Sequence, residues 1–335
     1  MNTFGRLFRV SIFGESHGES VGIVMDGCPA GIPLKHSDFQ ADFARRKSGS
    51  KGTTPRREPD IPKIMSGTFG DHSTGAPLMV LFENTNTRSR DYSRLKDIPR
   101  PGHADFTAFH KFGGFQDYRG GGHFSGRLTL GIVAAGVVAK KIIAPMTVQA
   151  RLTEAGGSTD IEAAVDRAVE EKDSIGGIIE CTIGHVPVGL GEPFFDSVEA
   201  LLSHMVFSIP AIKGIEFGSG FAAAGMRGSE HNDNIVSTDG TTETNHAGGI
   251  NGGITNGNEV VFRVAVKPTS STHQPQQTMN IQTGEMEELV IEGRHDVCIA
   301  LRVPVVLEAA AAIVMADLML QAQQSGRIYK PTSKH

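Results

Sequence analysis

The sequence has 335 residues, of which 39% are hydrophobic and 21% are charged, a balance typical of a soluble globular chain with a sizeable core. We find no apolar run of the ~18 residues that a membrane span needs, and residues 1–18 lack the apolar core and cleavage site of a signal peptide. These features argue against a membrane protein and favour a cytoplasmic one.

Three cysteines, Cys28, Cys181 and Cys298, are spread along the chain without a CxxC pair. An odd number at such spacing argues against a disulfide framework or a cysteine zinc site. We expect reduced, buried thiols and no bound metal.

The net charge of −5 is unevenly distributed. Residues 43–127 hold 15 Lys or Arg against eight Asp or Glu, a net of +7, which leaves −12 for the remainder. Such a basic segment indicates an anionic partner. RNA is one candidate, but the chain has no Trp and three Tyr to stack on bases, so a small polyanion is the better match.

The first strand is expected at Leu7–Phe13, and it runs directly into the motif GESHG. Ser16 and His17 therefore follow a strand end, which is a common position for functional residues. For His17 taken alone, a purely structural histidine is the alternative. The next strand is expected at Val21–Met25.

A helix is expected from Ser37, as its N-cap, to Arg46, and its end opens a run of six basic residues in 13 positions. These are Arg45, Arg46, Lys47, Lys51, Arg56 and Arg57. Cations at a helix C-terminus stabilise the helix dipole, which is the alternative explanation for Arg45 or Arg46. Six basic residues are more than the stabilisation of one helix end requires, so they indicate an anion-binding segment.

The stretch Pro101–Arg127 follows expected strands at Ile64–Thr68 and Pro77–Glu83, and it concentrates histidines and a triple glycine, Gly120–Gly122. Consecutive glycines are kept where the backbone takes a positive φ or approaches a ligand closely. A helix is expected next, at Leu128–Ile143, so the glycine loop enters a helix N-terminus, an anion site by geometry. The loop matches neither GxGxxG nor GxxxxGK[ST], so alone it is weak evidence.

The second half is expected to contain a helix at Asp160–Glu171, a strand at Gly177–Ile183, a helix at Asp196–Val206 and a last helix at Val305–Gln323. Loops rich in Gly, Asn, Ser or Pro separate these elements and could line a ligand site.

Two pairs of segments suggest an internal duplication. Residues 28–46 and 186–204 both read as a turn with Pro and Gly followed by a helix, and residues 74–89 resemble 256–271 in outline. Chance similarity between short units of this kind is the alternative.

Seven motifs occur in an order that resembles the chorismate synthase family, and they extend over nearly the whole chain, to about Gln323. They are GESHG (14–18), RPGHAD (100–105), DYRGGG (117–122), GLGEP (189–193), NHAGGI (245–250), KPTSS (267–271) and GRHD (293–296). Seven ordered motifs are far more specific than any single loop.

The resemblance implies an α+β fold, a β-α-β sandwich with antiparallel sheets flanking a helical core, with which the internal pseudo-duplication is compatible. We expect one catalytic domain over residues 1–325 and a polar tail over 326–335. The implied assembly is a homotetramer.

The implied activity is that of a lyase of the shikimate pathway, which supplies aromatic amino acid biosynthesis. It converts 5-enolpyruvylshikimate 3-phosphate to chorismate and phosphate by a 1,4-anti elimination, with no net redox change but only with reduced FMN. NADPH is a possible electron source, used directly or through a separate flavin reductase, and neither a nucleic acid nor a membrane partner is implied.

The resemblance also implies catalytic roles. His17 would protonate the departing phosphate, His103 the reduced flavin, and Asp296 would help to accept the ring proton. Imidazole suits the first two roles because its unperturbed pKa lies near neutrality.

Binding roles carry over in the same way. The substrate residues would be Ser16, Arg46, Lys51 and Arg57, of which Arg46 and Lys51 also correspond to NADP-binding positions. The flavin residues would be His123, Phe124, Ser125, Pro210, Ala211, Gly252, Lys267, Pro268, Thr269, Ser270, Ser271 and Arg294. Two departures are visible: many relatives carry RSS where this chain has HFS at 123–125, and Arg where it has Lys51.

Two other classes remain as alternatives. A non-catalytic phosphate- or nucleotide-binding protein would keep the glycine loops but would not need His17, His103 and Asp296. An RNA-binding protein would use the basic segment, and its affinity would fall steeply with salt.

Overall fold

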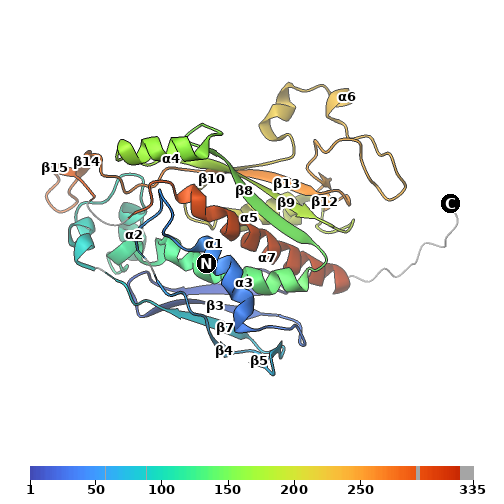
Figure 1. Cartoon of the computed structure of the whole chain (residues 1–335), viewed down its shortest axis with the longest axis horizontal. Coiled ribbons are helices and arrows are strands. Elements are labelled where there is room, and N and C mark those ends of the chain that lie inside the picture. The colour runs from blue at the N-terminus through green and yellow to red at the C-terminus, as the bar shows by residue number, and fades with distance from the viewer. Residues whose placement is uncertain (57, 88, 292–294, 325–335) are drawn as a thin grey trace.

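The computed structural model describes residues 1–56, 58–87, 89–291 and 295–324. Two antiparallel sheets lie on opposite sides of a pair of helices (Figure 1). The first sheet has the order β1 (Thr3–Phe4), β2 (Arg9–Gly14), β3 (Ser20–Asp26), β7 (Leu78–Glu83), β4 (Lys63–Ser66). The second has the order β10 (Ile212–Phe217), β13 (Val260–Val266), β9 (Gly177–Gly184), β8 (Thr147–Ala155).

Short elements complete the described chain. The two-stranded sheets are β5 (Thr68–Phe69) with β6 (His72–Ser73), β11 (Ile250–Asn251) with β12 (Ile254–Thr255), and β14 (Gln276–Met279) with β15 (Met286–Leu289). The α-helices are α1 (Gln40–Arg46), α2 (Asp105–Phe112), α3 (Thr129–Ile142), α4 (Ile161–Glu170), α5 (Val198–Val206), α6 (Gly228–His231) and α7 (Val303–Gln324). The 3₁₀ turns are η1 (His36–Phe39), η2 (Ser89–Lys96), η3 (Arg119–Phe124), η4 (Gly126–Leu128), η5 (Phe194–Asp196), η6 (Gly220–Gly225) and η7 (Ile299–Arg302).

Both sheets bury one face because their strands alternate apolar residues. In β7, Leu78, Val80 and Phe82 are fully buried, and in β13 Val260 and Phe262 are. Side chains two residues apart share a face of a strand, so this period of two gives each sheet an apolar face. The first sheet packs against α3 and the second against α7.

The helices α3 and α7 pack directly against each other between the sheets (Figure 1). Gly136 makes the contact close, because a Cβ added there would lie 2.3 Å from the Cβ of Ala309. All residues from Thr129 to Ala139 are buried, so α3 is apolar all round, as a core helix must be.

Within the described residues one helical stretch, Ile299–Gln323, is long and apolar enough to span a membrane, contrary to the expectation from sequence. In the fold, however, 83% of its apolar window is buried inside the protein. Its two acidic side chains are also paired there: Asp317 accepts hydrogen bonds from three backbone N–H groups of residues 6–8, and Glu308 binds Arg45. The stretch is therefore the core helix of a folded domain.

Most expected elements are confirmed to within two residues at each end. The strands at 7–13, 21–25, 77–83 and 177–183 are β2, β3, β7 and β9, and the helices at 128–143, 160–171, 196–206 and 305–323 are α3, α4, α5 and α7. The mixture of helices and antiparallel sheets confirms the α+β class. All three cysteines are buried and free, as expected.

Two details of the first half are wrong. The strand expected at Ile64–Thr68 ends at Ser66, because Gly67 takes φ +84° and turns the chain into β5. The expected N-cap at Ser37 lies inside η1 instead: the cap is at Lys35, whose backbone N–H is bound by the Asp38 carboxylate at 2.8 Å.

Candidate active site

A cavity of about 900 Å³ opens beside the central helices and is lined from both halves of the chain. The first half contributes the segment after α1, the turn before α2 and the glycine loop η3, while the second contributes the loops after α5 and β13 and the start of α7. Small-molecule sites usually measure roughly 300–1,000 Å³. The cavity is therefore large enough for a substrate together with a cofactor.

The triple glycine closes one wall of this cavity. Gly120, Gly121 and Gly122 take φ values of +61°, +80° and +54°, which side chains disfavour. A Cβ added to Gly120 would lie 2.5 Å from Cδ2 of His17, and the carbonyl of Gly122 accepts a hydrogen bond from the N–H of Ser16 at 3.1 Å. The glycines thus let the loop lie directly on the strand-end motif GESHG.

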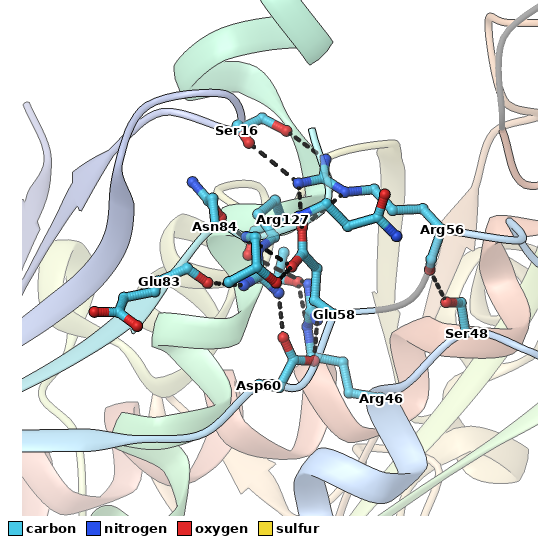
Figure 2. Close-up of polar contacts among 12 residues, drawn as sticks. Ser16, Arg46, Ser48, Arg56, Glu58, Asp60, Glu83, Asn84 and Arg127 are labelled. Atoms are coloured by element: carbon cyan, nitrogen blue, oxygen red, sulfur yellow. Dashed lines mark hydrogen bonds and ion pairs between the residues drawn. The ribbon is translucent and has the colours of Figure 1, made fainter. Parts of the chain in front are cut away.

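Charged residues form a second wall, drawn in Figure 2. Arg56 donates to the hydroxyl of Ser16 at 3.0 Å and to the Glu58 carboxylate at 2.8 Å. Burial alone would raise the pKa of Glu58, but hydrogen bonds from Arg56 and Thr85 hold it below its ordinary value. Ser16 is fully buried and oriented by this contact.

Deeper in the same wall, Asp60 lies between two buried guanidinium groups, those of Arg127 and Arg46 (Figure 2). Arg46 also donates to the carbonyl of Gly126 at 2.8 Å. Burial, followed by the charge of Arg302, lowers the pKa of Arg46 to about 9. With Asp296 nearby, three guanidinium groups face two carboxylates, so the cluster keeps a net positive charge that favours an anionic ligand.

Asp296 is buried and held from two sides. Its Oδ1 accepts from the backbone N–H of Thr54 at 2.9 Å, and both oxygens lie 3.3 Å from Nη1 of Arg302. Arg302 also donates to the carbonyl of Arg46 at 3.0 Å, so one side chain links the carboxylate to the cationic cluster. Oδ2 has the fewer contacts and is the more available proton acceptor.

His103 lines the cavity from the turn before α2. Its Nδ1 lies 2.6 Å from Oδ1 of Asp105. Burial lowers the pKa of His103 below its ordinary value, more than hydrogen bonding to Asp105 raises it. The lowered pKa favours the neutral imidazole near pH 7 in the ligand-free protein.

The loop Lys267–Ser271 forms the opposite rim. The ammonium of Lys267 donates to the hydroxyl of Ser270 at 2.7 Å, and that hydroxyl donates to the carbonyl of Gly102 at 2.7 Å. Burial, followed by the charge of Lys213, lowers the pKa of Lys267. The loop is thereby tied to the turn that carries His103.

Comparison with known proteins identifies the family. The family model described as chorismate synthase matches residues 8–320. A chorismate synthase from Chitinophaga pinensis is 65% identical over 98% of this chain and 100% of its own length, and one from Dehalococcoides mccartyi is 45% identical over 98% and 99%. The chain belongs to the chorismate synthase family. A solved structure titled "Crystal Structure of Chorismate Synthase" matches with a TM-score of 0.72 and 25% identity over 95% of this chain and 93% of that one.

The cavity brings most of the residues predicted from the family resemblance together. Those that line it are Arg46, His103, His123, Phe124, Ser125, Pro210, Ala211, Lys267, Pro268, Thr269, Ser270, Ser271 and Asp296. The segment HFS at 123–125 is one of the two places where this chain departs from many relatives. There, Nδ1 of His123 donates to the carbonyl of Gly14 at 2.8 Å, so this side chain connects the glycine loop to the first sheet.

Ser16 and His17 lie just behind the wall. His17 is 8% exposed and packs edge-on against Tyr92, with ring centres 5.1 Å apart, and against Gly120. Tyr92 and Gly120 both line the cavity, so the imidazole is separated from it by one layer.

Two predicted residues are placed elsewhere. Lys51 is 63% exposed and pairs with Asp166 of α4 at 2.5 Å, so its ammonium is turned away from the cavity lining. Gly252 lies in the turn between β11 and β12, outside the lining residues, with φ +61°. Arg57 and Arg294 lie outside the described residues.

Several lining residues escaped the sequence analysis. Asp60, Arg127 and Arg302 make the ion pairs described above, and Arg100 pairs with Asp105 at 2.7 Å. His295, inside the motif GRHD, has both ring nitrogens buried without a hydrogen-bond partner in the described part of the chain. His295 could have been found from its motif, whereas the ion pairs join residues far apart in sequence. Among the described residues no cluster of His, Cys, Asp or Glu forms a metal site.

Proposed function

We propose that this cavity is where the chain converts 5-enolpyruvylshikimate 3-phosphate to chorismate and phosphate by 1,4-anti elimination. As a member of the chorismate synthase family, the chain is a carbon–oxygen lyase of aromatic amino acid biosynthesis, and the family requires a reduced flavin. The observation that supports this site is the meeting of His103, Asp296 and a net positive cluster in one cavity.

The lining residues fit a flavin mononucleotide. A cavity of about 900 Å³ has room for a flat ring beside the substrate. His295 lines this cavity, and its buried nitrogens, which have no hydrogen-bond partner in the described part of the chain, would bind a polar group of the ligand. We propose that Lys267, Ser270 and Ser271 hold its phosphate or polar edge, with Pro210 and Ala211 against its ring. When bound, the reduced flavin supplies the electron-rich ring on which loss of the phosphate depends.

The remaining flavin contacts of the proposal are those implied by the family resemblance: His123, Phe124, Ser125, Pro268, Thr269, Gly252 and Arg294. The substrate carries two carboxylates and a phosphate, so its binding needs surplus cations. The role of Arg46 is supported by its place in the charged cluster around Asp60. The role of Ser16 is supported by the hydrogen bond that its hydroxyl accepts from Arg56. The family resemblance adds Arg57 and Lys51 to the set proposed for the substrate, and Lys51 would have to leave Asp166, its partner in the ligand-free chain, to reach it.

Proton movement is assigned to three residues. His17, behind Gly120 and Tyr92, would protonate the departing phosphate, and His103 would hold a proton at Nε2 for the cofactor side of the cavity. Asp296 would accept a proton at Oδ2, because Oδ1 is already bound to the Thr54 N–H. An electrically neutral His103 in the empty site would gain its proton when anionic ligands bind and raise its pKa.

Binding of FMN tests the cofactor part of the proposal. Lys267→Met removes the cation of the rim and should weaken FMN binding by about tenfold or more, the effect of losing a charge-assisted hydrogen bond. Fluorescence titration of FMN measures this. Lys111→Met, on the exposed side of α2, is the matched control and should bind FMN like the unmodified protein. Equal affinity for the Lys267 variant would place the flavin elsewhere.

The electron source and the assembly are also proposals. NADPH would reduce the flavin either directly, through a site that includes Arg46 and Lys51, or by way of a separate flavin reductase, in the cytoplasm. The homotetramer is the assembly that the family resemblance implies, and association between chains is supported by large exposed aromatic side chains, among them Phe194, Phe195 and Phe221 at 86%, 92% and 87% exposure. Light scattering should then give four times the chain mass of 35.7 kDa.

We further propose that the chain is a single catalytic domain, residues 1–325 with a tail at 326–335, built as a duplicated β-α-β sandwich. One cluster of buried apolar residues connects both sheets with α3 and α7, which supports a single domain. In support of the duplication, β3 and β7 are neighbours in one sheet as β9 and β13 are in the other, and a helix follows β3 and β9 alike.

A further inference from the structure

Asp105 lies in contact with the imidazole of His103, the residue to which we assign a proton transfer. Its Oδ1 lies 2.6 Å from Nδ1 of His103, and the side chains of the two residues are 7% and 21% exposed. An ionised carboxylate can only accept a hydrogen bond, so this contact requires a hydrogen on Nδ1. Nη2 of Arg100, which can only donate, lies 3.0 Å from the same nitrogen and favours the opposite tautomer. The carboxylate is the closer of the two partners, so its contact favours the tautomer with a free lone pair at Nε2.

Asp105 is itself held firmly. Arg100 donates to it from Nε at 2.7 Å, from Nη2 at 2.8 Å and from its backbone N–H at 3.1 Å. Asp105 is also the first residue of α2, where the positive end of the helix dipole stabilises a carboxylate. Burial would raise the pKa of Asp105, but Arg100 and His103 lower it far below its ordinary value. The carboxylate is therefore ionised near neutral pH.

Arg100 also connects Asp105 and His103 to the loop Lys267–Ser271 on the opposite rim of the cavity. Nη1 of Arg100 donates to the hydroxyl of Ser271 at 3.2 Å, and the Arg100 side chain is 6% exposed. The four side chains Ser271, Arg100, Asp105 and His103 thus form one connected row. On the other side of His103, the ring edge with Cε1 and Nε2 faces Gly121, which has no side chain to cover it.

We propose that Asp105, fixed by Arg100, is a positioning residue that sets the tautomer and the orientation of His103, so that Nε2 is the atom that gives and regains the proton. The inference rests on the proposed role of His103, but it concerns Asp105 and Arg100, to which the family resemblance assigns nothing. The charged groups that face His103 are Asp105, Arg100 and Lys267; the carboxylate raises its pKa and the two cations lower it.

Nitrogen NMR of the ¹⁵N-histidine-labelled protein tests the tautomer directly. The His103 signals are assigned by their loss in His103→Gln. We expect Nδ1 to carry the hydrogen and Nε2 to be unprotonated at neutral pH in the ligand-free protein. Hydrogen on Nε2 instead would overturn the proposal, whatever the activity of any variant.

The variant Asp105→Asn tests the role of the carboxylate. An amide can donate to Nδ1 as well as accept from it, so the His103 tautomer should shift toward Nε2–H, and its pKa should fall further because the raising charge is gone. We expect kcat to drop about 10²–10⁴-fold, as when an orienting carboxylate is neutralised beside a catalytic histidine, with a much smaller change in KM. Asp105→Glu keeps the charge and should recover part of the kcat.

Glu308→Gln is the matched control. It also neutralises a buried carboxylate bound to an arginine, Arg45 at 2.6 and 2.7 Å, but it touches no imidazole and does not line the cavity. It should lower the melting temperature and leave the His103 signals and kcat unchanged. If Asp105→Asn leaves the tautomer, the pKa of His103 and kcat unchanged, Asp105 has no positioning role. If instead His103→Gln retains full activity while the NMR result holds, the catalytic role of His103 fails and the positioning by Asp105 stands.

Discussion

At the scale of single residues, the partner of each cation decides whether it can meet a ligand. Arg45 and Lys51 come from the same basic run as Arg46 but are paired away from the cavity, with Glu308 and Asp166. Arg46 is 3% exposed and shares Asp60 with Arg127, so the cluster retains positive charge facing the cavity. Basic residues in sequence are thus a weak guide to anion contacts, because carboxylates from distant segments neutralise some of them.

Replacement of His103 tests its assignment at this scale. His103→Gln keeps a polar side chain of similar length but cannot gain and lose a proton near neutrality, so kcat should fall about 10²–10⁴-fold. Steady-state assays with reduced FMN measure the effect, and His72→Gln, at an exposed position of β6, should behave as the unmodified protein does. Activity within a factor of two of normal would remove His103 from the mechanism.

At the scale of elements, the close contact between α3 and α7 fixes the geometry of the cavity, because η4 and α3 follow the glycine loop while η7 and α7 follow Asp296. The contact depends on small residues, with Gly136 lying over Ala309. Interiors are packed densely enough that one extra methyl group is felt. The helices therefore hold the two halves of the site at a set distance.

Gly136→Ala tests this dependence. The new methyl group would lie 2.3 Å from the Cβ of Ala309, so the helices must separate, and we expect a loss of about 1–3 kcal/mol in the free energy of unfolding. Chemical denaturation measures it. Gly228→Ala in α6, where an added Cβ meets nothing within 4 Å, is the control and should change stability little. Equal stability of the two variants would show that the contact is not tight.

The elements themselves were largely predictable from sequence, and the reasons differ from one to another. The alternation in β7 and the apolar run in α3 are local signals. The helix expected from Asp160 is α4, and Asp160 is its N-cap, accepting from the N–H of Ala163 at 3.1 Å. The helix α2 was missed because it lies inside a glycine-rich stretch that read as a loop. The strand β8 was missed because its exposed positions are polar, so no apolar run marks it.

The site was less predictable than the elements. The motifs named His103, Asp296 and the loop after β13 from the family resemblance, and the cavity brings these together. No local pattern could join Arg127 to Asp60 or Arg302 to Asp296, since these pairs depend on how the chain folds. Lys51 shows the reverse case, because the family resemblance assigns it to the site and yet its ammonium pairs outside the cavity with Asp166.

At the scale of the whole molecule, both halves are needed to make one cavity. The first sheet and its loops bring the cationic cluster, the glycine loop and His103, and the second half brings Lys267 and Asp296. α7 joins them, because Asp317 binds the backbone at the start of the chain and Glu308 binds Arg45 of α1 and the backbone N–H of Ala150 in β8. The cavity thus depends on residues from both halves of the described chain, and the family match covers both, over residues 8–320.

The most direct measurement mixes the purified protein, chemically reduced FMN and 5-enolpyruvylshikimate 3-phosphate without oxygen, and follows chorismate, phosphate and the flavin spectrum. We expect chorismate and phosphate to form in equal amounts with reduced FMN, the flavin to be reduced again at the end of turnover, and no product to form with oxidised or absent FMN. Turnover at the same rate with oxidised FMN, or with none, would contradict this expectation.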